Sequence, residues 1–366
     1  MTGERATAGI VVGACPVRLW GMTTSERLRR TLVRAGVPME APGDGPFLAV
    51  RADWVLDESL IKALAARLDT VLVAETGEAV AAHLPAGASA AWLEAGAAPP
   101  AGLAVTDAEG LVPAYNVALR KREPAMLVRL TEATAPAVEA RMFGGSYKGV
   151  TDFVTKYLWP RPAMAVTRLC AQARITPNQV TLLSAVLTVA AFWLFWEGWF
   201  AWGLVCAWGM TFLDTVDGKL ARVTLTSSKW GNVFDHGIDL VHPPFWWWAW
   251  IVGVQHSLHP LGAPSPILSV VVIGYVAQRL QEGYFIGRHK LEIHIWRRFD
   301  SWFRLITARR NPNLAILTLA VAAGRPDIGM QVVAVWTVMS FAVHGLQIVQ
   351  AESARRNGPL TSWMAG

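Results

Sequence analysis

The pattern of apolar and polar positions divides the sequence near residue 140. Before that point, short apolar runs are separated by turn residues and by segments with helical periodicity. Strands that alternate with helices in this way predict a small α/β domain over residues 1–140. Residues 85–101 are rich in alanine, glycine and proline and are expected to form a loop. The expected strands are 7–14, 47–56, 70–74 and 103–105, and the expected helices are 25–35, 58–68, 78–84 and 127–142.

From residue 178 onward the sequence contains long apolar stretches. A helix crosses the hydrocarbon core of a bilayer with about 20 apolar residues. The stretches therefore predict an all-α transmembrane domain of six helices over residues 178–350. The fifth stretch is short for a span, and Pro243 and Pro244 are expected to distort the third. The six expected spans are 178–198, 200–222, 231–254, 265–286, 312–324 and 328–349.

Residues 145–177 join the two parts and mix basic with aromatic side chains. This composition predicts an amphipathic segment lying on the membrane surface. Basic residues also gather in the loop 288–310 and in the tail, whereas the opposite loops hold only Arg325. By the positive-inside rule, both termini and the site described below face the cytoplasm. We therefore expect an integral, multi-pass protein of the inner or plasma membrane.

The composition agrees with a membrane protein. Hydrophobic residues make up 53% of the chain and charged residues only 16%, which is poor in charge for a soluble protein. The net charge of +6 lies mainly beside the apolar runs, so it suits an anionic membrane surface and we expect no nucleic-acid partner. Three cysteines provide no disulfide framework. Residues 1–8 are polar, and no signal peptide is expected there.

Four acidic residues stand between two of the apolar stretches: Asp214, Asp217, Asp235 and Asp239. Carboxylates are costly in such surroundings and are usually functional. The first two share one face of a helix and the last two share a face of the next helix, so two facing helices would bring all four together. Four anions require a compensating charge, and we expect no nearby cationic partner for them except Arg222. One or two divalent cations with oxygen ligands would supply it.

Neighbouring residues suggest a phosphate ligand. Gly218 and Gly231 leave space for a ligand to approach the backbone. Arg222 can bind a phosphate through two hydrogen bonds. Acids for a metal, space for a ligand and an arginine for phosphate indicate phosphoryl-type transfer. The alternatives are a non-catalytic transporter with buried acids, and helices joined by incidental polar pairs; neither would show metal-dependent turnover.

These residues form the pattern D-x2-D-G-x2-A-R-x8-G-x3-D-x3-D. The pattern resembles the signature of the CDP-alcohol phosphotransferase (CDP-alcohol phosphatidyltransferase) family, and the resemblance covers residues 145–350. It implies a six-helix membrane enzyme that displaces CMP from a CDP-alcohol by the hydroxyl of a second alcohol, most often in phospholipid synthesis. It also implies two ions, Mg2+ or Mn2+. Asp214, Asp217 and Asp235 would hold one ion, Asp214, Asp235 and Asp239 the other, and Asp239 would be the general base.

Further contacts are expected at an acceptor and at the nucleotide. Arg279 either pairs with Glu282 or lines an acceptor pocket, and Arg309 and Arg310 either bind an acceptor phosphate or headgroup or anchor the chain at the membrane surface. The expected partners are a CDP-alcohol donor, an alcohol acceptor and membrane lipid, with a homodimer left open. The residues implied at the nucleotide and its phosphates are Gly218, Ala221, Arg222, Ser228, Gly231, Asn178 and Thr181.

The front part weakly resembles a sugar-nucleotide or nucleotide transferase domain. Residues 13–18 stand where a glycine-rich phosphate loop would follow the first strand. Pro16 lies where such a loop needs glycine and a free N–H. No acidic pair is clearly placed for a metal. We therefore expect a nucleotidyltransferase-like but non-catalytic domain, with a scaffold or regulatory role.

Two other enzymes remain open. An aspartate-rich membrane prenyltransferase also binds Mg2+ and diphosphate, but it lacks the D-G-x2-A-R element and would not release CMP. In a narrower alternative, the acceptor is a soluble inositol or sugar phosphate, which the front domain favours because relatives that use inositol phosphate carry a similar fusion. The sequence identifies neither alcohol.

Overall fold

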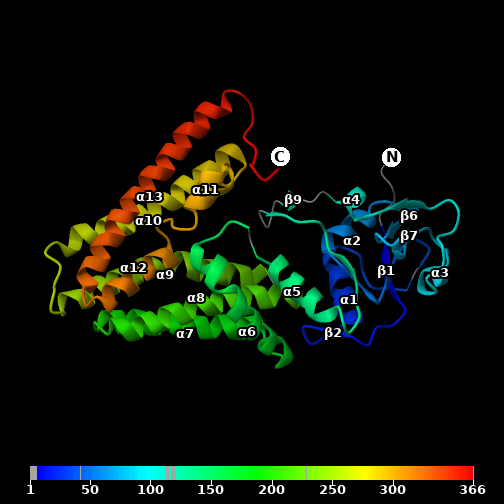
Figure 1. Ribbon diagram of the computed structural model, residues 1–366, viewed down its shortest axis with the longest axis horizontal. Coiled ribbons are helices and arrows are strands. Elements are labelled where there is room, and N and C mark those ends of the chain that lie inside the picture. Colours follow the sequence, from blue (N-terminus) through cyan, green and yellow to red (C-terminus); the bar gives the residue numbers. More distant parts are fainter. Residues whose placement is uncertain are drawn as a thin grey trace. The chain divides into compact units, whose positions relative to one another are not determined.

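The computed structural model describes residues 6–41, 43–112, 115–116, 121–147, 149–227 and 229–365, with the backbone alone described for 115–116, 121–122 and 229–236. The chain forms two compact units. The front unit comprises the residues up to Tyr147 together with Arg222–Leu225, and the second unit comprises the rest. Figure 1 shows sheet and helices in the front unit and helices alone in the second. This confirms an α/β part followed by an all-α part.

The front unit is built on one five-stranded sheet in the order β1-β4-β7-β6-β8. Strands β1 and β4 pair in parallel, as do β6 and β8, whereas β7 is antiparallel to both of its neighbours. Alternate residues of β4 contribute to two separate apolar clusters because successive side chains point to opposite faces. Helices α1 and α2 cover one face, and the short α3 packs on the other. The bounds are β1 Ala8–Val12, β4 Phe47–Arg51, β6 Thr70–Val73, β7 Ala79–Leu84, β8 Ala104–Thr106, α1 Thr24–Arg34, α2 Glu58–Leu64 and α3 Ala91–Glu94.

Two expected helices of this unit are wrong. Residues 79–84 form the central strand β7, in which every residue is buried. An alanine-rich apolar run has no period that separates a buried strand from a helix. The expected helix 127–142 is instead the strand β11 followed by α5, because β11 pairs with β5 and the threonines at 131 and 134 form a hydrogen-bonded turn. The remaining elements are β2 Arg18–Leu19, β3 Met22–Thr23, β5 Trp54–Leu56, α4 Ala108–Leu111, β9 Tyr115–Asn116, β10 Lys121–Arg122, β11 Leu127–Arg129 and α5 Ala135–Gly145.

The second unit contains a helix at each of the six stretches expected to span a membrane. Two of them, α7 and α13, are long and apolar enough to cross a bilayer, by length and composition, within the part of the chain that was described. The fifth, α12, has 13 residues. The bounds are η1 Val154–Leu158, α6 Pro160–Gln172, α7 Pro177–Trp196, α8 Phe200–Val223, α9 Lys229–Gln255, α10 Pro264–His289, η2 Ile293–Ile295, α11 Arg298–Phe303, α12 Arg310–Ala322 and α13 Pro326–Arg355.

The helices of this unit pack closely, with α7 against α9, and α13 against α10 and α12 (Figure 1). Helix α9 contains Pro243 and Pro244, and its helical assignment continues through both. Its buried tryptophans hold it against α7: Trp246 donates from Nε1 to the Thr188 carbonyl, at 3.0 Å. The contact with α7 also requires Gly253, since a Cβ there would lie 2.0 Å from the Phe195 carbonyl oxygen.

A histidine in the central strand makes the stability of the front unit sensitive to acid. His83 is fully buried on β7, and burial lowers its pKa below 6.5. In the unfolded chain the same ring takes up a proton near pH 6.5. Below that pH the unfolded state binds more protons, so folding free energy is lost as the pH falls toward the lowered pKa, by up to about 1.4 kcal/mol per pH unit.

We therefore expect amide hydrogens of β7 and β4 to exchange faster at pH 5.5 than at pH 7.5 in the full-length protein, after correction for intrinsic rates. His83→Leu should remove most of this acid sensitivity because it keeps the apolar packing without a titrating ring. Hydrogen-exchange mass spectrometry of peptides covering the two strands measures the effect. Equal acid sensitivity in the variant would assign the effect to another group.

Candidate active site

Two of the expected acids share one arginine. Asp214 on α8 accepts a hydrogen bond from Arg310 Nη2, with 2.6 Å between Nη2 and Oδ2. Asp239 on α9 accepts one from Nη1 of the same guanidinium. Arg310 is the first residue of α12, and its side chain is 15% exposed. Three helices therefore meet at one cation and two carboxylates.

Arg310 corrects the expectation that Arg222 is the only nearby cation. Arg310 lies 96 residues from Asp214 in the sequence, and helix packing brings the two together. Arg222 belongs to the front unit, where its Nη1 donates to the Ser146 carbonyl at 2.9 Å. The positive charge between Asp214 and Asp239 thus comes from Arg310, which the sequence analysis considered as a contact for the acceptor.

Asp217 lies one turn beyond Asp214 on α8 and is buried. Its Oδ2 accepts a hydrogen bond of 2.6 Å from Thr181 Oγ1 on α7. Its Oδ1 is also buried but has no hydrogen-bond partner. Buried carboxylate oxygens are normally satisfied, so a free one marks a position at which a further ligand can bind.

The first turn of α7 positions Thr181. Thr176 is the N-cap: its hydroxyl accepts from the Gln179 N–H at 3.3 Å, and the Gln179 side chain accepts from the Thr176 N–H at 2.8 Å. This reciprocal pair is a capping box, and Pro177 occupies the first helical position, where it has no donor to lose. The cap fixes where α7 begins and therefore where Thr181 meets Asp217. Asn178, in the same turn, is exposed.

Some residues of the expected site cannot be placed. Asp235 and Gly231 lie in the stretch of α9 for which the backbone alone is described, and Ser228 lies outside the described residues. Gly218 and Ala221 lie on α8 directly after Asp217, where both are half-buried. The structure thus joins Asp214, Asp217, Asp239, Thr181 and Arg310 among the sequence-derived candidates.

A cavity of about 320 Å3 adjoins Asp239 and is strongly basic. Arg279, Arg304, Arg309 and Arg310 line it, from α10, the segment after α11 and the start of α12. Three of these guanidiniums have a buried N–H without a hydrogen-bond partner; these atoms are Arg279 Nε, Arg304 Nη1 and Arg309 Nε. Unpartnered buried donors next to an open space are suited to an anion.

The arginines of the cavity are held by carboxylates. Arg279 and Arg309 both donate from Nη2 to Glu282, so the expected pairing of Arg279 with Glu282 is present. Burial lowers the pKa of Arg304 to about 9, with Arg309 acting in the same direction and Asp152 opposing, and the group stays charged at neutral pH. Burial favours neutral Asp152, but Arg304 and hydrogen bonds from Thr155 and Asn311 keep its pKa below 3.8.

Sequence reasoning did not select Asp152, Arg304 or Asn311 as site residues. Asp152 lies in the segment predicted to be an amphipathic surface helix, and Arg304 was one of many basic residues in the loop 288–310. A single acid among basic and aromatic residues was the one available signal for Asp152. Asn311, adjacent to Arg310, carries no pattern that separates it from a polar helix start.

The model of the CDP-alcohol phosphatidyltransferase family matches residues 174–356, which include α7 to α13 and all of the acids. The chain belongs to this family. The match covers the helices that carry the candidate site.

Three curated relatives are similar to parts of this chain. An archaetidylinositol phosphate synthase of Pyrococcus horikoshii is 36% identical over 80 residues, 22% of this chain and 42% of the relative. A phosphatidylinositol phosphate synthase of Streptomyces avermitilis is 33% identical over 110 residues, which are 30% of this chain and 42% of the relative. A phosphatidylinositol phosphate synthase of Corynebacterium glutamicum is 32% identical over 120 residues, which are 31% of this chain and 55% of the relative. The chain thus spans about half the length of these relatives.

Replacing Arg310 should destabilise the protein and increase its response to divalent cations. Arg310→Gln leaves Asp214 and Asp239 without their shared cation. Removing one partner of a buried ion pair costs about 3–5 kcal/mol, and we expect the lower end because Asp239 is 40% exposed. Adding Mg2+ after a chelator should raise the unfolding temperature of the variant more than that of the wild type.

Thermal unfolding of the detergent-purified protein, with and without Mg2+, measures both effects. Arg325→Gln is the matched control, since Arg325 also binds a carboxylate in two places, on Asp327. An identical Mg2+ response in the two variants would contradict the role given to Arg310.

Proposed function

We propose that the protein transfers a phospho-alcohol group from a CDP-alcohol to the hydroxyl of an acceptor that itself carries a phosphate, with release of CMP. The observation that carries this proposal is the basic cavity beside Asp239, in which three arginines present unpartnered N–H groups. A lipid alcohol without a phosphate would leave those donors unsatisfied. The names of the relatives, synthases of phosphatidylinositol phosphate or archaetidylinositol phosphate, support an inositol-phosphate-type acceptor.

The acids are suited to hold divalent cations, Mg2+ or Mn2+. All of the candidate ligands are carboxylate oxygens, which hard cations prefer, and Asp217 Oδ1 is buried without a partner. Asp214, Asp217, Asp235 and Asp239 would hold two such ions. When bound, divalent cations neutralise the negative charge of the donor diphosphate and of the leaving CMP. Thr181 would then orient Asp217 through its 2.6 Å hydrogen bond.

Asp239 is suited to accept the proton of the acceptor hydroxyl. Of Asp214, Asp217 and Asp239, it alone lines the basic cavity, and its side chain, 40% exposed, is the most accessible of the three. The hydroxyl oxygen would bond to the β-phosphorus of the donor, the bond from that phosphorus to the bridging oxygen would break, and CMP would leave. Arg310 holds the Asp239 carboxylate through an ion pair.

The remaining nucleotide contacts stay proposals. Gly218 and Ala221 directly follow Asp217 along α8, where a diphosphate bound to the acids would reach them. Arg222, Ser228, Gly231 and Asn178 are assigned to the nucleotide by the family signature. In the front unit, Arg51 is bonded to both Asp53 and Glu78, which neutralises the acids at the end of β4. This supports a non-catalytic role for residues 1–140.

We place the six helices α7, α8, α9, α10, α12 and α13 across the membrane, with residues 145–177 along its surface and the site on the cytoplasmic side. The two helices that meet the length and apolarity requirement, α7 and α13, support membrane insertion. The basic residues between α10 and α12 support the orientation.

Reporter fusions test this topology. A reporter fused before residue 1 or after residue 366 should behave as cytoplasmic, and one inserted at Gly324, between α12 and α13, should behave as external. Termini on opposite sides would mean an odd number of spans, and the short α12 would then be the first candidate for a helix that does not cross the membrane.

The reaction itself is tested by incubating membranes with pairs of CDP-alcohols and acceptors, and measuring CMP together with product mass. Inositol phosphate should serve as acceptor, inositol and diacylglycerol should not, and a chelator should abolish turnover until Mg2+ or Mn2+ is added. CTP with inositol phosphate alone should release no pyrophosphate. Turnover with unphosphorylated acceptors only would overturn the proposed acceptor class.

Asp239→Asn and Asp217→Ala should separate proton removal from ligand binding. Asp239→Asn keeps an oxygen for the cation but cannot take up a proton, so turnover should fall at least about 10²-fold with nucleotide binding retained. Asp217→Ala removes a ligand and should weaken cation and nucleotide binding together. Raising the Mg2+ concentration should partly restore Asp217→Ala only. Restoration of Asp239→Asn to the wild-type rate would place the base elsewhere.

A further inference from the structure

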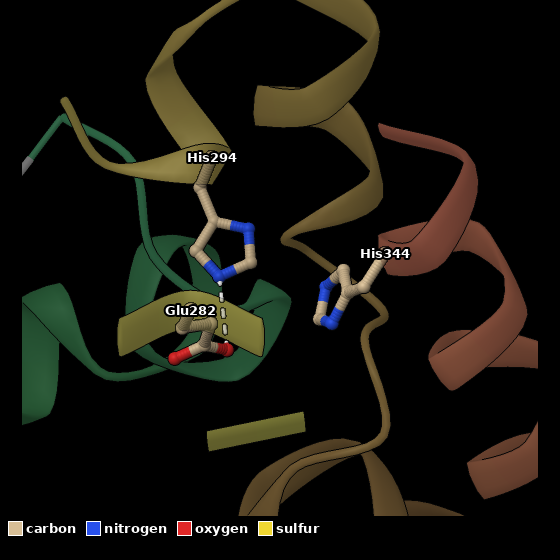
Figure 2. A group of neighbouring side chains, drawn as sticks. All are labelled: Glu282, His294 and His344. Carbon is tan, nitrogen blue, oxygen red and sulfur yellow. Dashed lines mark hydrogen bonds and ion pairs between the residues drawn. The ribbon is translucent and has the colours of Figure 1, made fainter. Parts of the chain in front are cut away.

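A buried group of ionisable side chains lies behind the basic cavity. It consists of Glu282 on α10, His294 on η2 and His344 on α13, whose ligand atoms lie within 4.8 Å of one another. Figure 2 shows the His294 ring directed at the Glu282 carboxylate, with His344 beside them. Both histidines are buried, and neither ring nitrogen of His344 has a hydrogen-bond partner. The composition alone would suit a transition metal.

The arginines exclude a cation from this group. Arg309 and Arg279 both donate from Nη2 to Oε1 of Glu282, the same oxygen that faces His294. Arg309 Nη2 also lies 3.4 Å from His294 Nε2. A divalent ion between these ligands would have to displace one guanidinium and lie against the other. Repulsion between like charges at that distance is strong away from water.

We propose instead that Glu282 is a positioning residue, which holds Arg279 and Arg309 in the orientation that binds the phosphate of the acceptor. This inference rests on the proposed function. One carboxylate oxygen accepts hydrogen bonds from Nη2 of both arginines, which line the cavity, and the buried Nε of each has no hydrogen-bond partner. In the described part of the chain, no other carboxylate is bonded to either guanidinium.

The surroundings of Glu282 make this arrangement rigid. His294 Nε2 lies 3.3 Å from Oε1, and burial, the dominant cause, keeps the pKa of His294 well below 6.5. The neutral ring therefore adds a hydrogen bond without adding a positive charge. His344, on α13, packs against His294 with 5.4 Å between the ring centroids. An ion pair enclosed in this way is weakly screened by solvent.

Loss of the Glu282 charge should allow the two guanidiniums to separate, because each would then face the other without an anion between them. Loss of the Glu282 charge should therefore weaken binding of the acceptor phosphate and leave binding of the CDP-alcohol donor unchanged. The structure therefore assigns Glu282 to the selection of phosphorylated over unphosphorylated acceptors, through the two arginines that it holds.

The test is Glu282→Gln in the full-length protein. KM for inositol phosphate should rise about tenfold or more, with KM for the CDP-alcohol within about twofold and kcat changed less than KM, the pattern of a lost binding interaction. Glu282→Asp, which keeps the charge, should restore part of the difference. Glu352→Gln is the matched control, since Glu352 also binds an arginine, Arg288, but at an exposed position.

A binding measurement separates this inference from the proposed reaction. Inorganic phosphate at millimolar concentration should raise the unfolding temperature of the wild type and of Glu352→Gln, but not that of Glu282→Gln, whether or not a product forms. An equal phosphate response in all three proteins, or an equal rise of both KM values in Glu282→Gln, would overturn the positioning role. So would a bound zinc or iron ion in the purified wild type that Glu282→Gln lacks.

Discussion

The second unit depends on the compensation of carboxylates among apolar helices. Asp214 and Asp239 lie on different helices and contact the same guanidinium. Without that cation, the repulsion between the two carboxylates in a medium of low polarity would drive the helices apart. Arg310 bonds to both of them and thereby links α8, α9 and α12 at one point.

The same charge pattern continues away from the acids. Arg310 pairs with Asp214 and Asp239, and both Arg310 and Asp239 also line the basic cavity. Each of the other arginines of the cavity is bonded to a carboxylate or lies near one: Arg279 and Arg309 to Glu282, and Arg304 near Asp152. Negative and positive groups therefore meet at Arg310 and Asp239. A cation at the acids and an anion at the arginines can bind next to each other in such an arrangement.

The site contains buried polar groups of both signs that lack hydrogen-bond partners. Some buried side chains elsewhere in the helical unit are satisfied, as for Trp250, whose Nε1 donates to the Pro326 carbonyl at 3.1 Å, whereas others, such as His344, are not. At the site, Asp217 Oδ1 and the N–H groups of three arginines remain open. Unsatisfied groups of both signs, on helices whose positions are fixed by packing, are pre-organised for ligands and need little rearrangement on binding.

The sequence alone was sufficient for the features that depend on local pattern. The helices at the six apolar stretches follow from residue spacing, because periodicity acts over one or two turns. The same local reasoning failed at β7, where a run of small apolar residues suits either a helix or a buried strand, and only pairing with β4 and β6 decides between them.

Contacts between helices were decided by the tertiary structure. Arg310 and Asp214 are 96 residues apart, Asp152 and Asn311 are 159 apart, and no spacing rule relates them. The sequence therefore named the acids but not their counter-ion, and it named Arg279 and Arg309 without showing that one oxygen of Glu282 holds both. Such contacts depend on which faces of distant helices meet, and that choice is made by the packing of the whole unit.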